Sequence, residues 1–328
     1  MEKVKFDSLT AGLPIEYMLP FPGKYDTLCK VIFMKKTIEG CLILLLTTII
    51  WGCAFVAQSV GMDHIGPFTF QAVRSFLAVL TLLPVIFLFD LKKKDGQSFI
   101  SRWRNPKLWI AGSLCGIALF IASGAQQVGL IDTDAGKAGF LTSMYIVIVP
   151  ILGLFFGKKL SPATILGVFV AVVGLYFISG AGGSGISPSD GLMILCAFAF
   201  AVQILLVERL GGNMDGLRLN SIQCLVCSVL SVIVMIFTET PTWANLSECA
   251  LPLAYAGCLS MGVAYSLQII GQKDLEPTTA SLIMSLESVF AALGGWLILH
   301  ESMTAWELLG CGLVFGAVIL SQLPVKKK

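Results

Sequence analysis

The feature that most constrains this chain is a series of ten apolar runs, each close to the length that crosses a lipid bilayer. A transmembrane helix needs about 20 mostly apolar residues. The runs are continuous, whereas strands of a membrane-spanning barrel alternate polar and apolar residues over about ten positions. We therefore expect ten helical spans, at Ile38–Val60, Pro67–Phe89, Leu108–Val128, Ala135–Phe156, Pro162–Ser179, Gly191–Leu210, Leu219–Thr238, Ala250–Ile270, Thr279–Leu299 and Ala305–Leu323.

The composition excludes a soluble protein. Of the 328 residues, 56% are hydrophobic and 13% are charged, whereas soluble domains carry about 25% charged residues. The 22 Lys and Arg and the 20 Asp and Glu are too few to coat soluble domains of this length, which rules out a water-soluble enzyme. Disordered chains are poor in apolar residues, and a net charge of +2 gives no basis for binding nucleic acid. We expect an all-α polytopic membrane protein.

The cations are distributed on one side of the predicted topology. If the chain crosses ten times, 20 of the 22 Lys and Arg fall on the same side as both termini. The opposite connections contain no cation but do contain acidic residues. Because cytoplasmic loops are enriched in Lys and Arg, we expect an integral multi-pass protein of a bacterial plasma membrane with both termini in the cytoplasm. The acidic residues on the other side are Asp63, Asp132, Asp190, Glu239 and Glu248.

The two halves of the chain share polar positions. Gln58 in the first span corresponds to Gln203 in the sixth at an offset of 145, and Gln126 corresponds to Gln268 at an offset of 142. The alternative is that apolar helices resemble one another by composition alone. Five spans per half would invert the second half in the membrane, as in secondary transporters. The predicted domains are a cytoplasmic N-terminal extension (1–36), two five-helix repeats (37–180 and 190–323) and a basic cytoplasmic tail (324–328).

This pattern resembles the EamA-type transporters of the drug/metabolite transporter superfamily. The resemblance rests on the five-plus-five spans, on Trp51-Gly52 with Phe55 in the first span, on Arg74 in the second, and on Glu301 after the ninth. It implies a basket of ten helices, in which spans 1–4 and 6–9 surround a central cavity and spans 5 and 10 lie at the periphery. It also implies transport of amino acids, purines, sugars, nucleotide sugars, drugs or metabolites, often outward.

Arg74 and Glu287 lie well inside predicted spans, where a charge is costly and usually marks a wet cavity or a partner. Arg74 cannot easily lose its proton. It is expected either to bind or gate an anionic group, such as a substrate carboxylate or phosphate, or to pin the fold through backbone carbonyls. Three interpretations of Glu287 stay open: a salt bridge to Arg74, recognition of a cationic or amine substrate, and a proton-coupling acid.

Lys137 lies near the outer start of the fourth predicted span. One interpretation gives it a part in substrate binding or gating. The other is an interfacial lysine that extends toward water or pairs with Asp132 and Asp134, which directly precede the span.

Uncharged polar and aromatic side chains complete the expected binding site. Repeat-related amides offer donors and acceptors to a cargo that must be held and then released, although each could equally bond a neighbouring helix. Aromatic side chains inside spans form either a cavity wall or ordinary packing. The candidates are Gln58, Gln203, Gln126, Gln268, Trp51, Tyr145 and Tyr265.

Motifs of other functional classes are missing from the sequence. It has two widely separated His, no metal-ligand or nucleophile arrangement and no Walker A pattern, so we expect neither an enzyme, a metal site nor a cofactor. We predict a secondary transporter that exports a small polar or amphipathic metabolite, amino-acid-like or drug-like, by alternating access. The cargo's own gradient or protons would drive it. A channel or a structural membrane protein is the alternative.

A stripe of small residues bears on helix packing and on oligomeric state. Gly312 and Gly316 form a GxxxG pattern in the tenth span, and Gly167 with Gly174 forms a small-residue stripe in the fifth. Such faces let two helices approach closely. The close approach would occur within the bundle or between two copies, so the protein is expected to be a monomer or a homodimer.

Overall fold

Proline marks the start of many helices. Pro67, Pro106, Pro162, Pro188 and Pro277 each open a helix. At this position the missing N–H costs no hydrogen bond, and the fixed φ suits the helix. An apolar run follows each proline and forms the body of the helix.

The computed structural model describes residues 22–93, 96–133, 135–155, 157–158, 160–178, 188–212, 214–273, 275–298 and 303–322, and the regular structure in these ranges is entirely helical. The chain divides into two units, Met1–Ile38 and Glu39–Lys328. The helices are α1 (Pro22–Met62), α2 (Pro67–Lys92), α3 (Phe99–Trp103), α4 (Pro106–Gly129), α5 (Ala135–Ser143), α6 (Tyr145–Phe155), α7 (Pro162–Ile178), α8 (Pro188–Gly211), α9 (Gly216–Thr238), α10 (Trp243–Glu248), α11 (Ala250–Ala254), η2 (Tyr255–Ala264), α12 (Tyr265–Gln272), α13 (Pro277–Met284), α14 (Leu286–Ile298) and α15 (Ala305–Gln322).

Eight helical segments of the described chain are long and apolar enough to cross a membrane, whereas the sequence predicted ten. Shorter apolar helices, Pro162–Ile178 and Ala305–Leu320, occupy the predicted fifth and tenth spans. A helix of 17 residues such as α7 is about 26 Å long, which is less than the hydrocarbon core of about 30 Å. The structure therefore has eight candidate spans and two shorter apolar helices in its described part.

Several sequence predictions fall outside the described residues. They concern Asp134, the acidic Glu301, residues 1–21 of the N-terminal extension and the tail at 324–328. The remainder of the extension, from residue 22, belongs to α1.

Three of the candidate spans are interrupted. The span Lys137–Phe155 consists of α5 and α6, separated at Met144, and the span Pro277–Ile298 consists of α13 and α14, separated at Ser285. In the span Ala250–Gln272, the π-helix η2 lies between α11 and α12. Discontinuous membrane helices and π-helical segments are frequent at functional sites, because they free backbone groups and redirect side chains.

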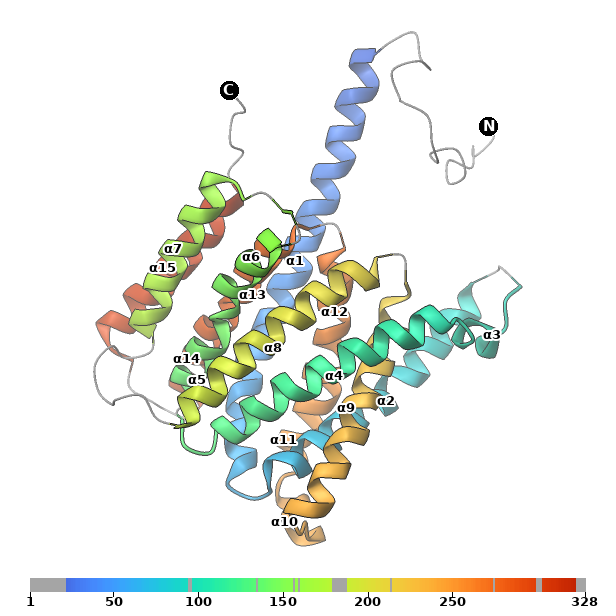
Figure 1. Cartoon of the computed structure of the whole chain (residues 1–328), viewed down its shortest axis with the longest axis vertical. Coiled ribbons are helices and arrows are strands. Elements are labelled where there is room, and N and C mark those ends of the chain that lie inside the picture. Colours follow the sequence, from blue (N-terminus) through green and yellow to red (C-terminus); the bar gives the residue numbers. More distant parts are fainter. Residues whose placement is uncertain are drawn as a thin grey trace. The chain divides into compact units, whose positions relative to one another are not determined.

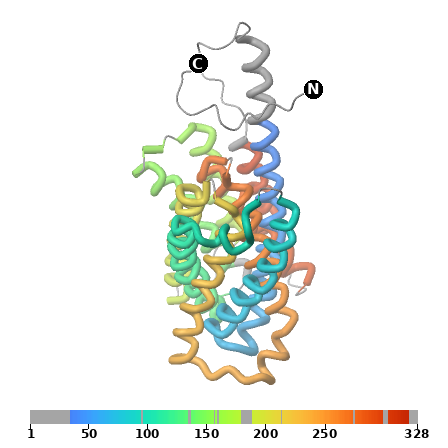
Figure 2. The backbone as a smooth tube through the Cα atoms, turned by 90° about the vertical axis from the view of Figure 1, so that its right-hand side faces the viewer, coloured from blue at the N-terminus to red at the C-terminus, as the bar shows by residue number. Residues whose placement is uncertain are grey.

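Neighbouring helices in the Glu39–Lys328 unit come from distant parts of the sequence. α2 lies beside α9, α4 contacts both α8 and α9, and α5 contacts α14 (Figures 1 and 2). α7 and α15 pair closely (Figure 1). A Cβ at Gly174 of α7 would lie 2.8 Å from the carbonyl oxygen of Gly310 in α15, whereas a Cβ at Gly312 or Gly316 would meet nothing within 4 Å. The close approach within the bundle therefore uses Gly174 and Gly310 rather than the GxxxG pair.

Large apolar side chains cover the outside of the helices. Phe155, Ile236, Phe237 and Leu251 are among those exposed. Monomeric soluble proteins rarely expose extended apolar surfaces. Together with the candidate spans, this exterior fits a helical bundle in lipid.

A buried cluster of charges joins α2 to α9 at one end of the pair. Arg218 of α9 is 2% exposed. It donates from Nη2 to Asp90 of α2 and from Nη1 to Oδ2 of Asp215 at 2.6 Å. Its Cζ also lies 5.4 Å from the ring centroid of Trp103 and 5.9 Å from that of Phe99. The guanidinium is thus neutralised by carboxylates and packed against aromatic rings.

Other charged side chains also connect helices. At the opposite end of the α2–α9 pair, the Glu239 carboxylate accepts hydrogen bonds from the backbone N–H of Phe68 at 2.8 Å and of Thr69 at 2.7 Å. It therefore caps the N-terminus of α2, where a negative charge is favourable. Lys158 lies 2.6 Å from Oε1 of Glu208 and links the end of α6 to α8.

Candidate functional site

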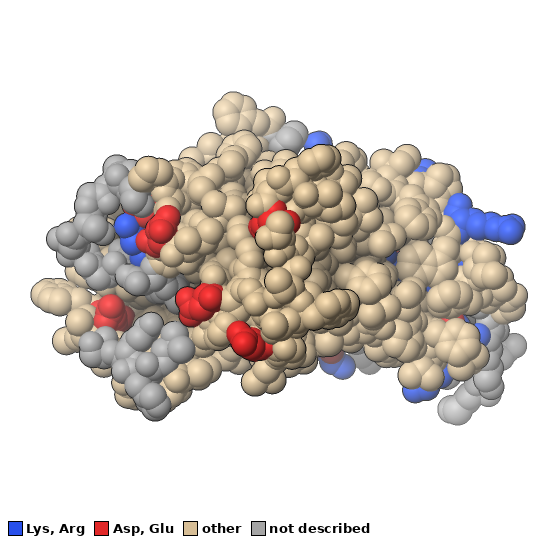
Figure 3. All heavy atoms as spheres, turned by 90° about the horizontal axis from the view of Figure 1, so that it is seen from below, with Lys and Arg blue, Asp and Glu red and all other residues tan. Residues whose placement is uncertain are grey.

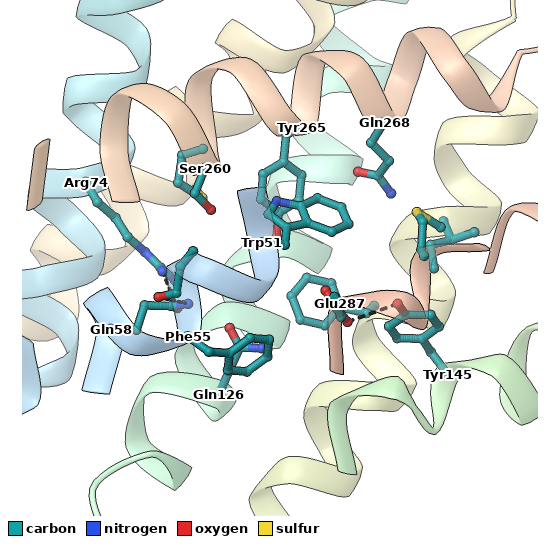
Figure 4. Close-up of a pocket in the computed structure, with 15 residues that line it drawn as sticks. Trp51, Phe55, Gln58, Arg74, Gln126, Tyr145, Ser260, Tyr265, Gln268 and Glu287 are labelled. Carbon is teal, nitrogen blue, oxygen red and sulfur yellow. Dashed lines mark hydrogen bonds between the residues drawn. The ribbon is translucent and has the colours of Figure 1, made fainter. Parts of the chain in front are cut away.

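A cavity lies in the interior of the Glu39–Lys328 unit, lined by side chains from both halves of the chain. Its volume is about 30 Å³, which is enough to hold a water molecule. Eight of the ten residues that the sequence predicted for the site line this cavity, and Figure 4 shows them pointing into it from several helices. They are Trp51, Gln58, Arg74, Gln126, Tyr145, Tyr265, Gln268 and Glu287.

Arg74 enters the cavity from α2 and is 2% exposed. Its Nη1 donates to Oε1 of Gln58, and its Cζ lies 5.6 Å from the ring centroid of Phe70. Its Nε is buried and has no hydrogen-bond partner. Because a guanidinium carries five N–H donors and a permanent charge, a single amide leaves most of its binding capacity unused. Among the described residues, Arg74 makes no hydrogen bond to a backbone carbonyl, which was the structural role that the sequence left open.

Glu287 enters from the first turn of α14, directly after the interruption at Ser285. It is 5% exposed, and its Oε1 accepts a hydrogen bond of 2.9 Å from the hydroxyl of Tyr145. Tyr145 itself starts α6, directly after the interruption at Met144. The two helix breaks therefore place a carboxyl and a hydroxyl together at one side of the cavity. A helix N-terminus also favours a negative charge at this position.

Arg74 and Glu287 do not form the salt bridge that was one interpretation of the sequence. Each contacts an uncharged partner instead, an amide for Arg74 and a phenol for Glu287. Among the described residues, neither has an ion-pair partner. The cavity thus has a guanidinium and a carboxyl group, and neither has a charged partner among the described residues.

Aromatic rings form the wall between these two groups in the view of Figure 4. The ring centroids of Trp51 and Tyr265 are 4.8 Å apart, and the indole Nε1 of Trp51 is buried without a hydrogen-bond partner. Gly52 allows α1 to approach α14 here, because a Cβ at this position would lie 2.8 Å from the backbone nitrogen of Ala291. The Trp51-Gly52 pair of the sequence thus supplies both a ring and the close approach that positions it.

The four predicted glutamines divide between the cavity wall and the layer behind it. Gln58, Gln126 and Gln268 line the cavity. Gln203 is fully buried outside the lining, and its Oε1 accepts a hydrogen bond of 3.1 Å from Nε2 of Gln268. Gln126 donates to the hydroxyl of Thr142 at 3.3 Å. Gln203 thus holds a lining residue, and the repeat-related pair Gln58 and Gln203 does not occupy equivalent places.

Lys137 is not part of the cavity lining. Its Nζ lies 2.9 Å from Oδ1 of Asp190 in α8, so it fastens α5 to α8. The sequence proposed Asp132 or Asp134 as its partner. Asp132 instead accepts a hydrogen bond of 3.2 Å from the hydroxyl of Ser189.

The sequence did not single out the contribution of η2. Ser260 and Met261 of this π-helix line the cavity. Asn220 of α9 holds the segment, because its Nδ2 donates to the carbonyl oxygens of Met261 at 2.9 Å and Gly262 at 2.8 Å. A polar amide inside the seventh apolar run was a signal that could have identified Asn220. Nothing in the residue pattern marks a π-helix.

The described residues contain no cluster of three or more His, Cys, Asp or Glu side chains suited to a metal ion. What the lining offers is one guanidinium, one carboxyl, three amides, two phenols, a serine hydroxyl and an indole N–H. These groups bind polar and charged parts of a small molecule through hydrogen bonds and ion pairs. The arrangement suits reversible binding of a small polar molecule.

A multi-pass helical bundle with an apolar exterior and a buried polar cavity has the architecture of a membrane transporter. Comparison with known families agrees: the EamA-like transporter family matches residues 38–180 and 187–323, which is most of this chain. The chain belongs to the EamA-like transporter family. It is therefore an integral multi-pass membrane protein of the transporter class and not an enzyme.

Individual relatives are also transporters by name. An uncharacterized transporter of Archaeoglobus fulgidus is 33% identical over 291 residues, 88% of this chain and 88% of that protein. The threonine/homoserine exporter RhtA of Escherichia coli K12 is 27% identical over 258 residues, 77% of this chain and 81% of that protein. A solved crystal structure superimposes with a TM-score of 0.72 at 18% identity, covering 87% of this chain and 96% of that chain, and shows the same fold.

Proposed function

We propose that this protein is a secondary transporter that exports a small polar or amphipathic metabolite of amino-acid-like chemistry by alternating access. The observation that carries the proposal is the buried cavity in which Arg74 and Glu287 are both open to an outside partner. Intramembrane charges are retained where function needs them. The relative named as a threonine/homoserine exporter supports both the amino-acid-like cargo and the outward direction.

The proposed topology has ten spans in two inverted repeats, residues 37–180 and 190–323, with α7 and α15 as the fifth and tenth spans. Both termini, including residues 1–36 and 324–328, are cytoplasmic in a bacterial plasma membrane. The two family matches along the chain and the interruptions at Met144 and Ser285 support the repeat. In Figure 3 the acidic side chains lie over the left and middle of the face, and most of the Lys and Arg lie toward its right-hand end. This separation supports a non-cytoplasmic side that is poor in Lys and Arg.

The burial of the lining favours a transporter over an open channel. Arg74 is 2% exposed and Glu287 is 5% exposed, so the groups that would bind cargo have little access to solvent in this conformation. A buried site inside a helical bundle supports alternating access rather than a continuous pore.

The lining residues have distinct proposed roles. Arg74 and Glu287 bind the charged parts of the cargo, and the remaining groups orient it or cover its apolar part. Gln203 acts indirectly by holding Gln268, and Lys137 acts outside the cavity by fixing α5 to α8. The groups that orient or cover the cargo are Trp51, Gln58, Gln126, Tyr145, Tyr265 and Gln268.

The energy source is either the gradient of the cargo itself or an opposing proton gradient. Glu287 supports the proton option, because it is the carboxyl among the lining residues. Under that option, Glu287→Gln abolishes the pH dependence of transport, and an imposed proton gradient accelerates only the parent protein. Equal pH dependence in both proteins would remove Glu287 from the coupling.

The test is transport by the purified full-length protein in proteoliposomes, with labelled threonine as the first substrate and the other standard amino acids after it. We expect saturable uptake that unlabelled cargo inside the vesicles accelerates. Arg74→Ala should lose this exchange, whereas Lys158→Gln, a matched change of a cation outside the cavity, should keep it. Uptake that rises linearly with concentration and shows no exchange would indicate a channel. No uptake of any amino acid would contradict the proposed cargo.

A further inference from the structure

We infer that the cargo binds as a zwitterion in one fixed orientation, with its carboxylate on Arg74 beside Gln58 and its ammonium group on Glu287 beside Tyr145. The inference rests on the proposed transport function and deepens it, because it assigns each charge of the cargo to a residue. It is carried by three observations: the incomplete bonding of Arg74, the incomplete bonding of Glu287, and the wall between them.

The positive side of the cavity is prepared for a carboxylate. Arg74 is almost completely buried, yet its only hydrogen bond among the described residues goes to the amide oxygen of Gln58, and its Nε has no partner. A buried donor without a partner is costly. A carboxylate accepts two parallel hydrogen bonds from a guanidinium, which makes it the matching ligand for an Arg side chain with free donors.

The negative side is prepared for an ammonium group. Glu287 is also almost completely buried, and the hydroxyl of Tyr145 donates to one of its carboxyl oxygens. No Lys or Arg of the described chain lies within ion-pair distance of it. An ammonium group brings three donors and a full positive charge, whereas the Glu287 carboxyl has one donor, the Tyr145 hydroxyl, and no cation among the described residues.

The charge balance selects a molecule with both groups. A zwitterion would neutralise Arg74 and Glu287 together, and every buried charge would then have an opposite partner. A pure anion would pair with Arg74 and form no ion pair with Glu287, and a pure cation would leave the permanent charge of Arg74 unpaired. A molecule with one charge therefore forms one buried ion pair where the zwitterion forms two, so it should bind more weakly than the matching zwitterion.

The wall between the two charged groups indicates where the rest of the cargo lies. In Figure 4, Arg74 and Gln58 lie at one side, Glu287 and Tyr145 at the other, and Trp51 with Tyr265 between them. The two rings, tilted by 57° to each other, offer an apolar surface to a side chain of the cargo. The unpaired indole N–H of Trp51 adds one donor for a polar substituent.

Derivatives of an amino acid that carry only one of its two charges test this orientation. Their binding to the purified full-length protein in detergent can be measured without transport. The zwitterion is the standard amino acid that raises the melting temperature most. Its methyl ester keeps only the ammonium charge, and its N-acetyl derivative keeps only the carboxylate. From the concentration dependence of the melting temperature, we expect the parent protein to bind the zwitterion at least about tenfold more tightly than either derivative.

The two site variants should then show crossed effects, meaning that each variant loses the affinity contributed by a different charge of the amino acid. In Arg74→Gln the amino acid should fall to the affinity of its methyl ester, and the ester itself should bind as in the parent. In Glu287→Gln the amino acid should fall to the affinity of its N-acetyl derivative. Arg74→Lys and Glu287→Asp should restore part of each preference, and Lys158→Gln, outside the cavity, should keep the parent pattern.

Three results would overturn the inference: exchanged effects of the two variants, equal weakening of all three ligands, or an absence of any stabilising amino acid. Failure of the transport proposal would look different. In that case the crossed pattern appears in detergent, but the protein shows no exchange in vesicles. Exchange of an amino acid without the crossed pattern would instead leave a transporter whose cargo is oriented otherwise.

Discussion

Two buried arginines on neighbouring helices, Arg74 on α2 and Arg218 on α9, show how differently one chain treats the same charged group. Both are 2% exposed. Arg218 contacts two carboxylates, Asp90 and Asp215, and packs against aromatic rings. Arg74 donates to one amide oxygen and has no carboxylate partner among the described residues, although the Nε of both arginines is buried without a hydrogen-bond partner. The first is neutralised within the protein, and the second is not.

The difference separates a structural charge from a functional one. Removing one member of a buried ion pair leaves an unpaired charge and destabilises the fold. Removing a buried charge that has no opposite partner relieves its desolvation cost instead. Arg218 should therefore matter most for stability, and Arg74 with Glu287 should matter most for cargo. The predictions that follow test this contrast, beginning with the largest expected change in stability.

Arg218→Gln should lower the free energy of unfolding by about 3 kcal/mol. The reason is that Asp90, with a side chain only 6% exposed, loses its closest partner, although Lys93 and Arg102 remain 3.6 Å from its Oδ1. Denaturant titration of the detergent-solubilised protein measures the loss. The double variant Asp90→Asn/Arg218→Gln should recover part of it. A single variant as stable as the parent would break the contrast with Arg74.

Glu239→Gln should cost about 1–2 kcal/mol, the range for loss of a charged helix cap. Its carboxylate accepts from the backbone N–H groups of Phe68 and Thr69 and from the Thr69 hydroxyl at 2.6 Å. The same denaturant titration measures this effect, with Glu248→Gln, an exposed carboxylate, as control. Equal effects of the two variants would show that the cap contributes nothing specific.

Lys158→Gln should change stability by less than about 1 kcal/mol. Its partner Glu208 is as accessible as Lys158 itself, with 28% of each side chain exposed, so water replaces much of the lost interaction. The small effect makes this variant a suitable control for the cavity variants. A loss as large as that of Arg218→Gln would mean that exposure does not separate the two kinds of ion pair.

The smallest expected effect concerns Asp215 and appears only in acid. Burial alone would raise the pKa of the Asp215 carboxyl, but the backbone N–H of Arg218 and the charges of Arg218 and Lys93 outweigh it and hold the pKa below its usual value. Because this pKa is lower in the folded than in the unfolded protein, the ionised carboxylate stabilises the fold at pH values above the unfolded-state pKa of about 4. The stabilisation disappears as the pH falls toward the pKa of the folded state. Melting temperatures between pH 6 and pH 3 should therefore fall less for Asp215→Asn than for the parent; equal slopes would contradict the assignment.

Helix positions follow closely from the apolar runs, but helix interruptions do not. Pro67 and Pro162 start helices where the sequence predicts a span to start, because proline and apolar length are local signals. Pro150 is the residue of the fourth apolar run that most disfavours a helix interior, yet it lies inside α6 and the interruption is at Met144. Met144 and Ser285 are ordinary helix residues, and tertiary packing rather than local preference decides that the helix breaks there.

The candidate site was predictable to the extent that it depends on charge and polarity inside spans. Arg74, Glu287 and the lining glutamines could be found this way, because polar groups at membrane depth need a reason. The same rule assigned Gln203 and Lys137 to the site. In the structure Gln203 instead accepts a hydrogen bond from Gln268 behind the cavity wall, and Lys137 forms an ion pair with Asp190. Which side of a helix faces a cavity depends on its neighbours, and the sequence does not contain that information directly.

The central claim is that Arg74 and Glu287 are kept unpaired for the cargo and not for the fold. The double variant Arg74→Gln/Glu287→Gln tests it most directly, through its melting temperature in detergent and amino-acid exchange in proteoliposomes. We predict a melting temperature equal to or above that of the parent protein, together with exchange reduced to the level of protein-free vesicles. A melting temperature that falls as far as that of Arg218→Gln, or exchange that survives, would contradict the account.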